Sequence, residues 1–170
     1  MKWGRGHVDP WWDESFKELS YALVDIPNQE DIPIWEKDYR PDIDCRKGYV
    51  YDMKQKTPDY GLPFITMMKD WQNVGISFFK QTCFQVLPTH SDNYKRYRQV
   101  FDIEDPSVIY RCVVFLEDWK SGHYLEVDGT PVLPWKKGDY VWWNFDTPHY
   151  SGNFGKENKY TMQITGMLSG

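Results

Sequence analysis

The chain has 170 residues, a length typical of one domain with one hydrophobic core. Its 20 Lys and Arg residues against 25 Asp and Glu give a formal net charge of −5, which argues against a dedicated nucleic-acid-binding protein because such proteins usually present a basic face. Lys95, Arg96 and Arg98 form either a solvated charge run or a local basic groove. The aromatic content of 18% favours a sheet-based fold, in which large rings line a cavity, a surface or simply the core.

Cysteine usage and the N-terminus bear on the cellular compartment. Cys45, Cys83 and Cys112 form no CxxC pair and no regular spacing, which predicts reduced, buried thiols in a cytoplasmic protein. The first ten residues lack the apolar core of a signal peptide. No apolar run approaches the ~20 residues that a membrane helix requires, so we expect no membrane partner. The sequence does not indicate the oligomeric state.

Two helices are expected in the N-terminal part of the chain. Phe16, Leu19 and Leu23 recur at i, i+3 and i+7, which predicts an amphipathic helix over residues 12–24. A second short helix is predicted over residues 64–71, because the large apolar side chains of that segment share one helical face. Between them, prolines interrupt the polar residues 27–63, which predicts an extended covering segment with a short strand at 49–53.

From residue 75 onward, short stretches rich in aromatic and β-branched residues alternate with turn residues. The expected strands are 76–86, 108–117, 124–128, 140–145 and 159–165. Repeated short strands without intervening helices predict a mainly β fold, a sandwich or jelly roll, with the N-terminal helices packed on one outer face. We expect a single domain over residues 1–170, in which residues 1–74 support a jelly-roll core at 75–168.

Three side chains form a candidate metal site. Residues i and i+2 share one face of a strand, so His90 and Asp92 are expected to project to the same side. Phe84, Val86 and Pro88 are the apolar residues expected on that face. His149 follows a strong strand signal at residues 138–145. A His-x-Asp pair with a distant His can hold one face of an iron(II) ion and leave three positions open. The alternative is an exposed His90 and a turn-forming Asp92.

The two other histidines are weaker candidates for metal ligands. His7 lies in the glycine-rich N-terminus, where we expect only local contacts. His123 begins a predicted strand and is expected not to be a ligand, although it lies where it can line a cavity. The metal hypothesis therefore depends on His90, Asp92 and His149.

A cosubstrate anchor is predicted ten residues after His149. Lys159 and Thr161 belong to the polar face of a strand, which meets either water or the lumen of a barrel. Facing a lumen, the ammonium group and the hydroxyl can hold the far carboxylate of a 2-oxo acid. A buried lysine is costly without a partner, so such a site predicts a bound anion or a shifted pKa. Arg111, a lone cation on an apolar strand face, either reaches solvent or binds a carboxylate of cosubstrate or substrate.

Five segments together resemble the 2-oxoglutarate/iron(II)-dependent dioxygenases, over about residues 75–168. The segments are LPTHSD at 87–92, FLEDWKSG at 115–122, KGD at 137–139, FDTPHYSGN at 145–153 and KYT at 159–161, where the family has Arg-x-Ser. Within the family, the spacing from His149 to Asn153 and the strand of Arg111 are similar to the aspartyl/asparaginyl β-hydroxylase branch. Residues 1–74 resemble nothing in the family.

The resemblance implies a double-stranded β-helix, a cupin-like jelly roll whose core at 75–168 is catalytic. It implies His90, Asp92 and His149 as iron(II) ligands, and Lys159 with Thr161 on the 5-carboxylate of 2-oxoglutarate. Lysine cannot form the bidentate fork of arginine, so the clamp is either weaker or suited to a different 2-oxo acid.

The implied reaction consumes O2 and 2-oxoglutarate, releases succinate and CO2, and hydroxylates a C–H bond of a small-molecule or peptide substrate. Trp119, Tyr140, Trp142 and Trp143 are expected either to line the cavity or to fill the core. Two alternatives stay open. One is a metal-binding cupin without oxygenase activity, and the other is a non-catalytic jelly-roll module that binds ligands on its aromatic rings.

Overall fold

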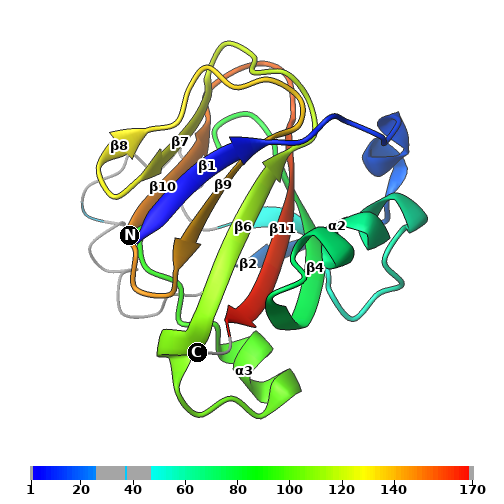
Figure 1. Ribbon diagram of the computed structural model, residues 1–170. Coiled ribbons are helices and arrows are strands. Elements are labelled where there is room, and N and C mark those ends of the chain that lie inside the picture. The colour runs from blue at the N-terminus through cyan, green and yellow to red at the C-terminus, as the bar shows by residue number, and fades with distance from the viewer. Residues whose placement is uncertain (1, 26–36, 38–46, 169–170) are drawn as a thin grey trace.

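The computed structural model describes residues 2–25, 37 and 47–168, which form two antiparallel sheets (Figure 1). The larger sheet runs in the order β1 (Trp3–His7), β9 (Asp139–Asn144), β6 (Ile109–Phe115), β11 (Lys159–Leu168), β4 (Trp71–Gln81), β3 (Lys47–Tyr51) and β2 (Ala22–Asp25). The smaller sheet runs β5 (Val86–His90), β10 (His149–Asn153), β7 (His123–Val127) and β8 (Thr130–Pro131). This mainly β arrangement is a cupin-like jelly roll, as predicted.

The larger sheet carries apolar clusters on both faces. Along β6, Val113 and Phe115 point between the two sheets, where they pack with residues of β7 and β9. The alternate residues Cys112 and Val114 point to the opposite face and join a second cluster with the N-terminal part of the chain. Side-chain alternation thus places an apolar cluster on each face of the larger sheet. The site lies in the part of the space between the sheets that these side chains do not fill.

The N-terminal segments cover part of the outer face of the larger sheet, as expected. The 3-10 helix η1 (Glu14–Glu18) inserts Phe16, which is fully buried, and α2 (Leu62–Met67) adds Phe64. The rings of Trp12 and Phe64 lie 5.6 Å apart, and in Figure 1 α2 lies in front of β4. These rings hold the N-terminal segment on the sheet through apolar burial.

The expected helix over residues 12–24 is wrong. Only η1 forms, with Asp13 accepting a hydrogen bond from the Ser15 N–H, and the chain then enters strand β2. Leu23, expected on the same buried face as Phe16, is 52% exposed and pairs with Tyr49 of β3. Backbone pairing with a neighbouring strand has overridden a helical side-chain period.

Other expectations were closer to the structure. The second helix and the strand at 49–53 correspond to α2 and β3, and four of the five C-terminal strands are found with small shifts. The first, expected over 76–86, instead divides into β4 and β5. Strands β1, β8 and β10 and the helix α3 (Lys95–Phe101) were not predicted. Most of the expected covering segment before residue 47 lies outside the described residues.

Cys112 is buried as expected, whereas Cys83 is exposed, and Cys45 lies outside the described residues. His7 ends β1, where its Nδ1 lies 2.7 Å from Oδ1 of Asp139. Within the described part of the chain, no helix has the length and apolar character needed to cross a membrane.

Candidate active site

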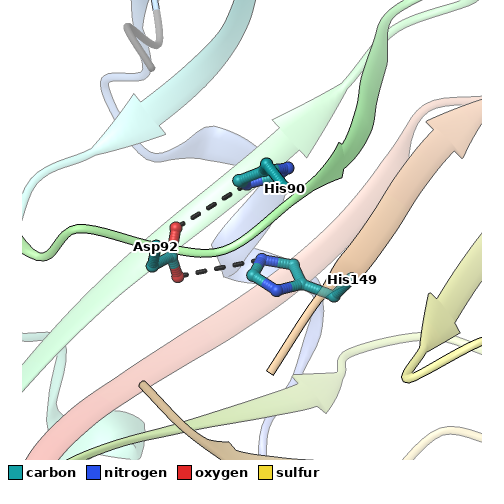
Figure 2. A group of neighbouring side chains, drawn as sticks. All are labelled: His90, Asp92 and His149. Atoms are coloured by element: carbon teal, nitrogen blue, oxygen red, sulfur yellow. Dashed lines mark ion pairs between the residues drawn. The ribbon is translucent and has the colours of Figure 1, made fainter. Parts of the chain in front are cut away.

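His90, Asp92 and His149 converge on one point, as the sequence predicted (Figure 2). His90 ends β5, His149 begins β10, and the two residues lie opposite each other in adjacent strands. Nε2 of His90 lies 3.7 Å from Oδ1 of Asp92, and Nε2 of His149 lies 3.8 Å from Oδ2. One donor atom from each residue lies within 4.8 Å of the others, a spacing at which a single ion can contact all three.

A β-bulge sets the face on which His90 lies. His90 pairs with His149, but Leu87 pairs with Ser151. Between these two pairs β5 therefore contains one residue more than β10. Leu87 and His90 consequently both line the cavity between the sheets. The expectation that Phe84, Val86 and Pro88 share the face of His90 is therefore wrong. Phe84 is an exposed turn residue with a φ of +65°.

The backbone fixes the orientation of both imidazole rings. Nδ1 of His90 lies 2.6 Å from the carbonyl oxygen of Pro88, and Nδ1 of His149 lies 3.0 Å from that of Thr147. A carbonyl oxygen only accepts, so each Nδ1–H is the donor, and the neutral ring carries its lone pair on Nε2. Metal-binding histidines are typically held in this way by a group on the second nitrogen.

The ionisation of His149 and Asp92 suits a cation. Burial lowers the pKa of His149 to about 4, although the Asp92 carboxylate opposes this shift, so the ring is neutral at pH 7. Burial alone would raise the pKa of Asp92, but the charge of Arg111, together with the contacts of His149 and His90, outweighs burial and holds that pKa well below its usual range. A carboxylate and two imidazole nitrogens are the forms in which these side chains bind metals.

Arg111 pairs with the carboxylate of Asp92, a partner that the sequence analysis did not consider. Its Nη2 lies 3.3 Å from Oδ2 of Asp92, and its Nη1 donates to Oε1 of Gln163. The guanidinium group lies over the ring of Tyr94, 5.0 Å from its centroid. Arg111 is thus held by Asp92, Gln163 and Tyr94, and it supports the carboxylate of Asp92 at Oδ2, the oxygen that His149 also faces.

The triad lines a cavity of about 270 Å³ between the two sheets. Its lining residues are Val50, Asp52, Met53, Ser77, Phe79, Leu87, His90, Asp92, Arg96, Arg111, Val113, Leu125, Trp143, His149, Ser151, Lys159, Thr161 and Gln163. Of the aromatic residues expected as walls, Trp143 lines this cavity. Tyr140 and Trp142 instead pack on the outer face of the larger sheet, and Trp119 packs beside the inner core.

Lys159 and Thr161 face the lumen rather than bulk water. Lys159 is only 3% exposed, and its Nζ donates to Oε1 of Gln81, the carbonyl oxygen of Tyr124 and Oγ of Ser151. No carboxylate among the described residues pairs with it. Burial lowers the pKa of Lys159 to about 7. The structure therefore places a buried cation, without an acidic partner in that part of the chain, in the same cavity as the triad.

His123 is buried away from the triad, where its Nε2 lies 3.0 Å from the carbonyl oxygen of Glu157. The basic run is not a single groove, because Arg96 pairs with Asp52 at 3.1 Å while Arg98 donates to backbone carbonyls. Sequence reasoning missed Ser151 and Gln81. For Ser151 a signal existed, since it lies two residues after His149 on the same strand face.

Comparison with known proteins supports the fold. No protein-family profile matches the chain, and no curated protein sequence does. A prolyl-4-hydroxylase of Pseudomonas putida is similar in structure, with a TM-score of 0.57 at 13% identity, covering 92% of this chain and 97% of that one. The α-ketoglutarate-dependent carbocyclase SnoK of nogalamycin biosynthesis has a TM-score of 0.57 at 11% identity, covering 89% and 81%.

A 2OG-Fe(II) oxygenase family oxidoreductase of Burkholderia pseudomallei is also similar, with a TM-score of 0.56 at 10% identity, covering 90% of this chain and 75% of that one. At such low identity these likenesses concern the fold. The chain has the double-stranded β-helix fold of the 2-oxoglutarate/iron(II) oxygenases, as the resemblance in sequence implied. The narrower likeness to the aspartyl/asparaginyl β-hydroxylase branch stays a prediction.

Proposed function

We propose that this protein is an iron(II)- and 2-oxoglutarate-dependent oxygenase that hydroxylates a C–H bond of a small-molecule or peptide substrate and releases succinate and CO2. The observation that carries the proposal is the convergence of His90, Asp92 and His149 within 4.8 Å, in the cavity that also contains the buried cation of Lys159. The fold, shared with known oxygenases, supports it.

The residues present fit an iron(II) ion. Two imidazole nitrogens and one carboxylate are the donor set of facial iron(II) sites, and the rings are already oriented by backbone carbonyls. Bound there, iron(II) would supply the redox chemistry with O2 that no amino-acid side chain provides. In this proposal His90, Asp92 and His149 hold the ion, and Arg111 keeps Asp92 ionised and oriented.

The rest of the cavity would bind and orient the organic molecules. Lys159 and Thr161 would hold the 5-carboxylate of 2-oxoglutarate, which places its keto acid end toward the triad. Phe79, Val113 and Leu125 give the cavity apolar walls that limit the access of water. The substrate would enter past Asp52 and the exposed Arg96, an ion pair that also lines the cavity.

We also propose that residues 1–170 form one domain with a catalytic core at 75–168, and that the protein works in the cytoplasm. Strand β1 is part of the larger sheet, which ties the N-terminus to that core. Free thiols at Cys83 and Cys112 fit a reducing compartment.

The proposal is tested by anaerobic addition of iron(II) and 2-oxoglutarate, followed by exposure to O2. We expect a visible charge-transfer band before oxygen is admitted, and succinate in amounts matching the 2-oxoglutarate consumed afterwards. A metal-binding cupin without oxygenase activity would bind the metal without the band or succinate. A non-catalytic binding module would show neither metal binding nor turnover.

Binding of 2-oxoglutarate is expected to depend on pH through Lys159. Burial lowers the pKa of Lys159 to about 7, and a bound dianion favours the protonated amine, so affinity should be highest below pH 7. Above pH 7 the Kd should rise by up to about tenfold per pH unit, since one proton is taken up on binding. The measurement is a titration of the manganese(II)-loaded protein followed by tryptophan fluorescence between pH 6 and 9. A flat profile would remove Lys159 as the anchor.

A further inference from the structure

The side chain of Gln81 has one defined orientation. It ends β4 and is fully buried, and its Nε2 donates to the carbonyl oxygens of Gln85 and Ser151, at 3.4 and 3.3 Å. Because those oxygens only accept, the amide cannot be reversed. Its Oε1 therefore points to the other side, where it accepts from Oγ of Ser151 at 2.7 Å and from Nζ of Lys159 at 3.2 Å.

Lys159 is hydrogen-bonded but not neutralised. An ammonium group has three N–H donors, and the structure supplies three acceptors, namely Oε1 of Gln81, the carbonyl oxygen of Tyr124 at 2.6 Å and Oγ of Ser151 at 2.8 Å. All three acceptors are uncharged. A buried charge normally has an ionic partner, and position 81 is where a glutamate of the same shape would supply one.

Ser151 is the hydrogen-bond acceptor of Lys159 that a ligand in the cavity can replace. Of the three acceptors of Lys159, only Ser151 lines the cavity, together with Thr161. The Ser151 hydroxyl donates to Oε1 of Gln81 and can rotate its O–H toward a ligand instead, whereas the amide of Gln81 and the carbonyl of Tyr124 are held in place. A carboxylate at this point can accept from Lys159, Ser151 and Thr161 while Gln81 keeps the lysine in position.

We propose that Gln81 decides which 2-oxo acid the site accepts. As a fixed, neutral acceptor it positions Lys159 but leaves the positive charge for the ligand to neutralise, so the site takes a 2-oxo acid with a second carboxylate and discriminates against 2-oxo monoacids. This inference rests on the proposed function. Glutamate at position 81 would form an internal ion pair with Lys159, and the second carboxylate of a diacid would then meet a neutral pair.

The test compares the wild type, Gln81→Glu and Gln72→Glu. Gln72 is an exposed residue of the same strand, which makes it a matched control for the added charge. The probes are 2-oxoglutarate and 2-oxobutanoate, titrated into the manganese(II)-loaded protein by calorimetry. We expect Gln81→Glu to weaken 2-oxoglutarate binding by about 30-fold or more and to change 2-oxobutanoate binding by less than about threefold, the size expected from loss of a charge-assisted contact. Gln72→Glu should match the wild type.

Two results would overturn the role of Gln81. One is a Gln81→Glu protein, folded by thermal melting, that prefers 2-oxoglutarate as strongly as the wild type does. The other is obtained with the wild type alone, if it binds 2-oxobutanoate as tightly as it binds 2-oxoglutarate. A wild type that binds metal but neither 2-oxo acid would instead refute the proposed function. Gln81→Leu removes the acceptor of Lys159 without adding charge, so it should weaken 2-oxoglutarate binding by less than Gln81→Glu does.

Discussion

Replacement of His149 by alanine is expected to abolish succinate formation and to weaken the binding of iron(II) or manganese(II) by more than about 100-fold, since loss of an outer partner of a ligand alone costs 10- to 100-fold. Among the described residues, His90 and Asp92 would then be the remaining donors of the site, and β10 would contribute none. Electron paramagnetic resonance measures the binding of manganese(II), and mass spectrometry quantifies succinate.

A histidine outside the site provides the control. His7 is partly exposed and pairs with Asp139 at the end of β1, so His7→Ala should leave metal affinity and turnover unchanged. His149 also packs on the ring of Trp143, 4.7 Å between centroids, so His149→Gln is included to retain most of the side-chain volume. Undiminished metal affinity in both His149 variants would exclude this residue from the ligand set.

The triad was predictable because two of its three residues are close in sequence. His90 and Asp92 are two residues apart, and that spacing alone brings them close together at the end of a strand. The position of His149 depends on the pairing of β10 with β5, and no local pattern specifies that pairing. The sequence placed His149 after a strand, whereas the structure makes it the first residue of one.

The bulge in β5 shows where periodicity stops being informative. A strict alternation assigns Val86 and Pro88 to the face of His90, but one extra residue opposite β10 moves Leu87 into the cavity instead. A one-residue shift exchanges the two faces of a strand. Bulges leave no regular signature in a single sequence, so the identity of the cavity wall was not predictable at this position.

The N-terminal strand was missed for a different reason. Its glycines suggest a loop, yet in β1 they make room for aromatic rings, since a Cβ on Gly4 would lie 2.8 Å from the ring of Trp142. A Cβ on Gly6 would likewise meet the ring of Tyr140. The glycines thus let two rings of β9 lie against the neighbouring strand, a packing reason that appears only once β1 is paired.

Replacement of Lys159 by alanine is expected to raise the Kd for 2-oxoglutarate by about 30- to 100-fold, the range for losing a charge-assisted hydrogen bond, while metal affinity changes by less than about threefold. The lysine lies in the same cavity as the triad but contacts Gln81, Tyr124 and Ser151 rather than a candidate metal ligand. The Lys159→Ala protein should therefore lose affinity for 2-oxoglutarate while it keeps its affinity for the metal. Both are measured on one preparation by titrating manganese(II) first and 2-oxoglutarate second.

A lysine and a ligand serve as controls for this variant. Lys156, exposed and three residues earlier in the chain, gives a matched Lys156→Ala protein that should bind both ligands as the wild type does. 2-Oxobutanoate lacks the second carboxylate, so its Kd should be the same in the wild type and in Lys159→Ala. If Lys159→Ala instead weakens both 2-oxo acids equally, the loss comes from a disturbed cavity, and the anchor for the far carboxylate must be sought among other cations of the cavity, beginning with Arg111.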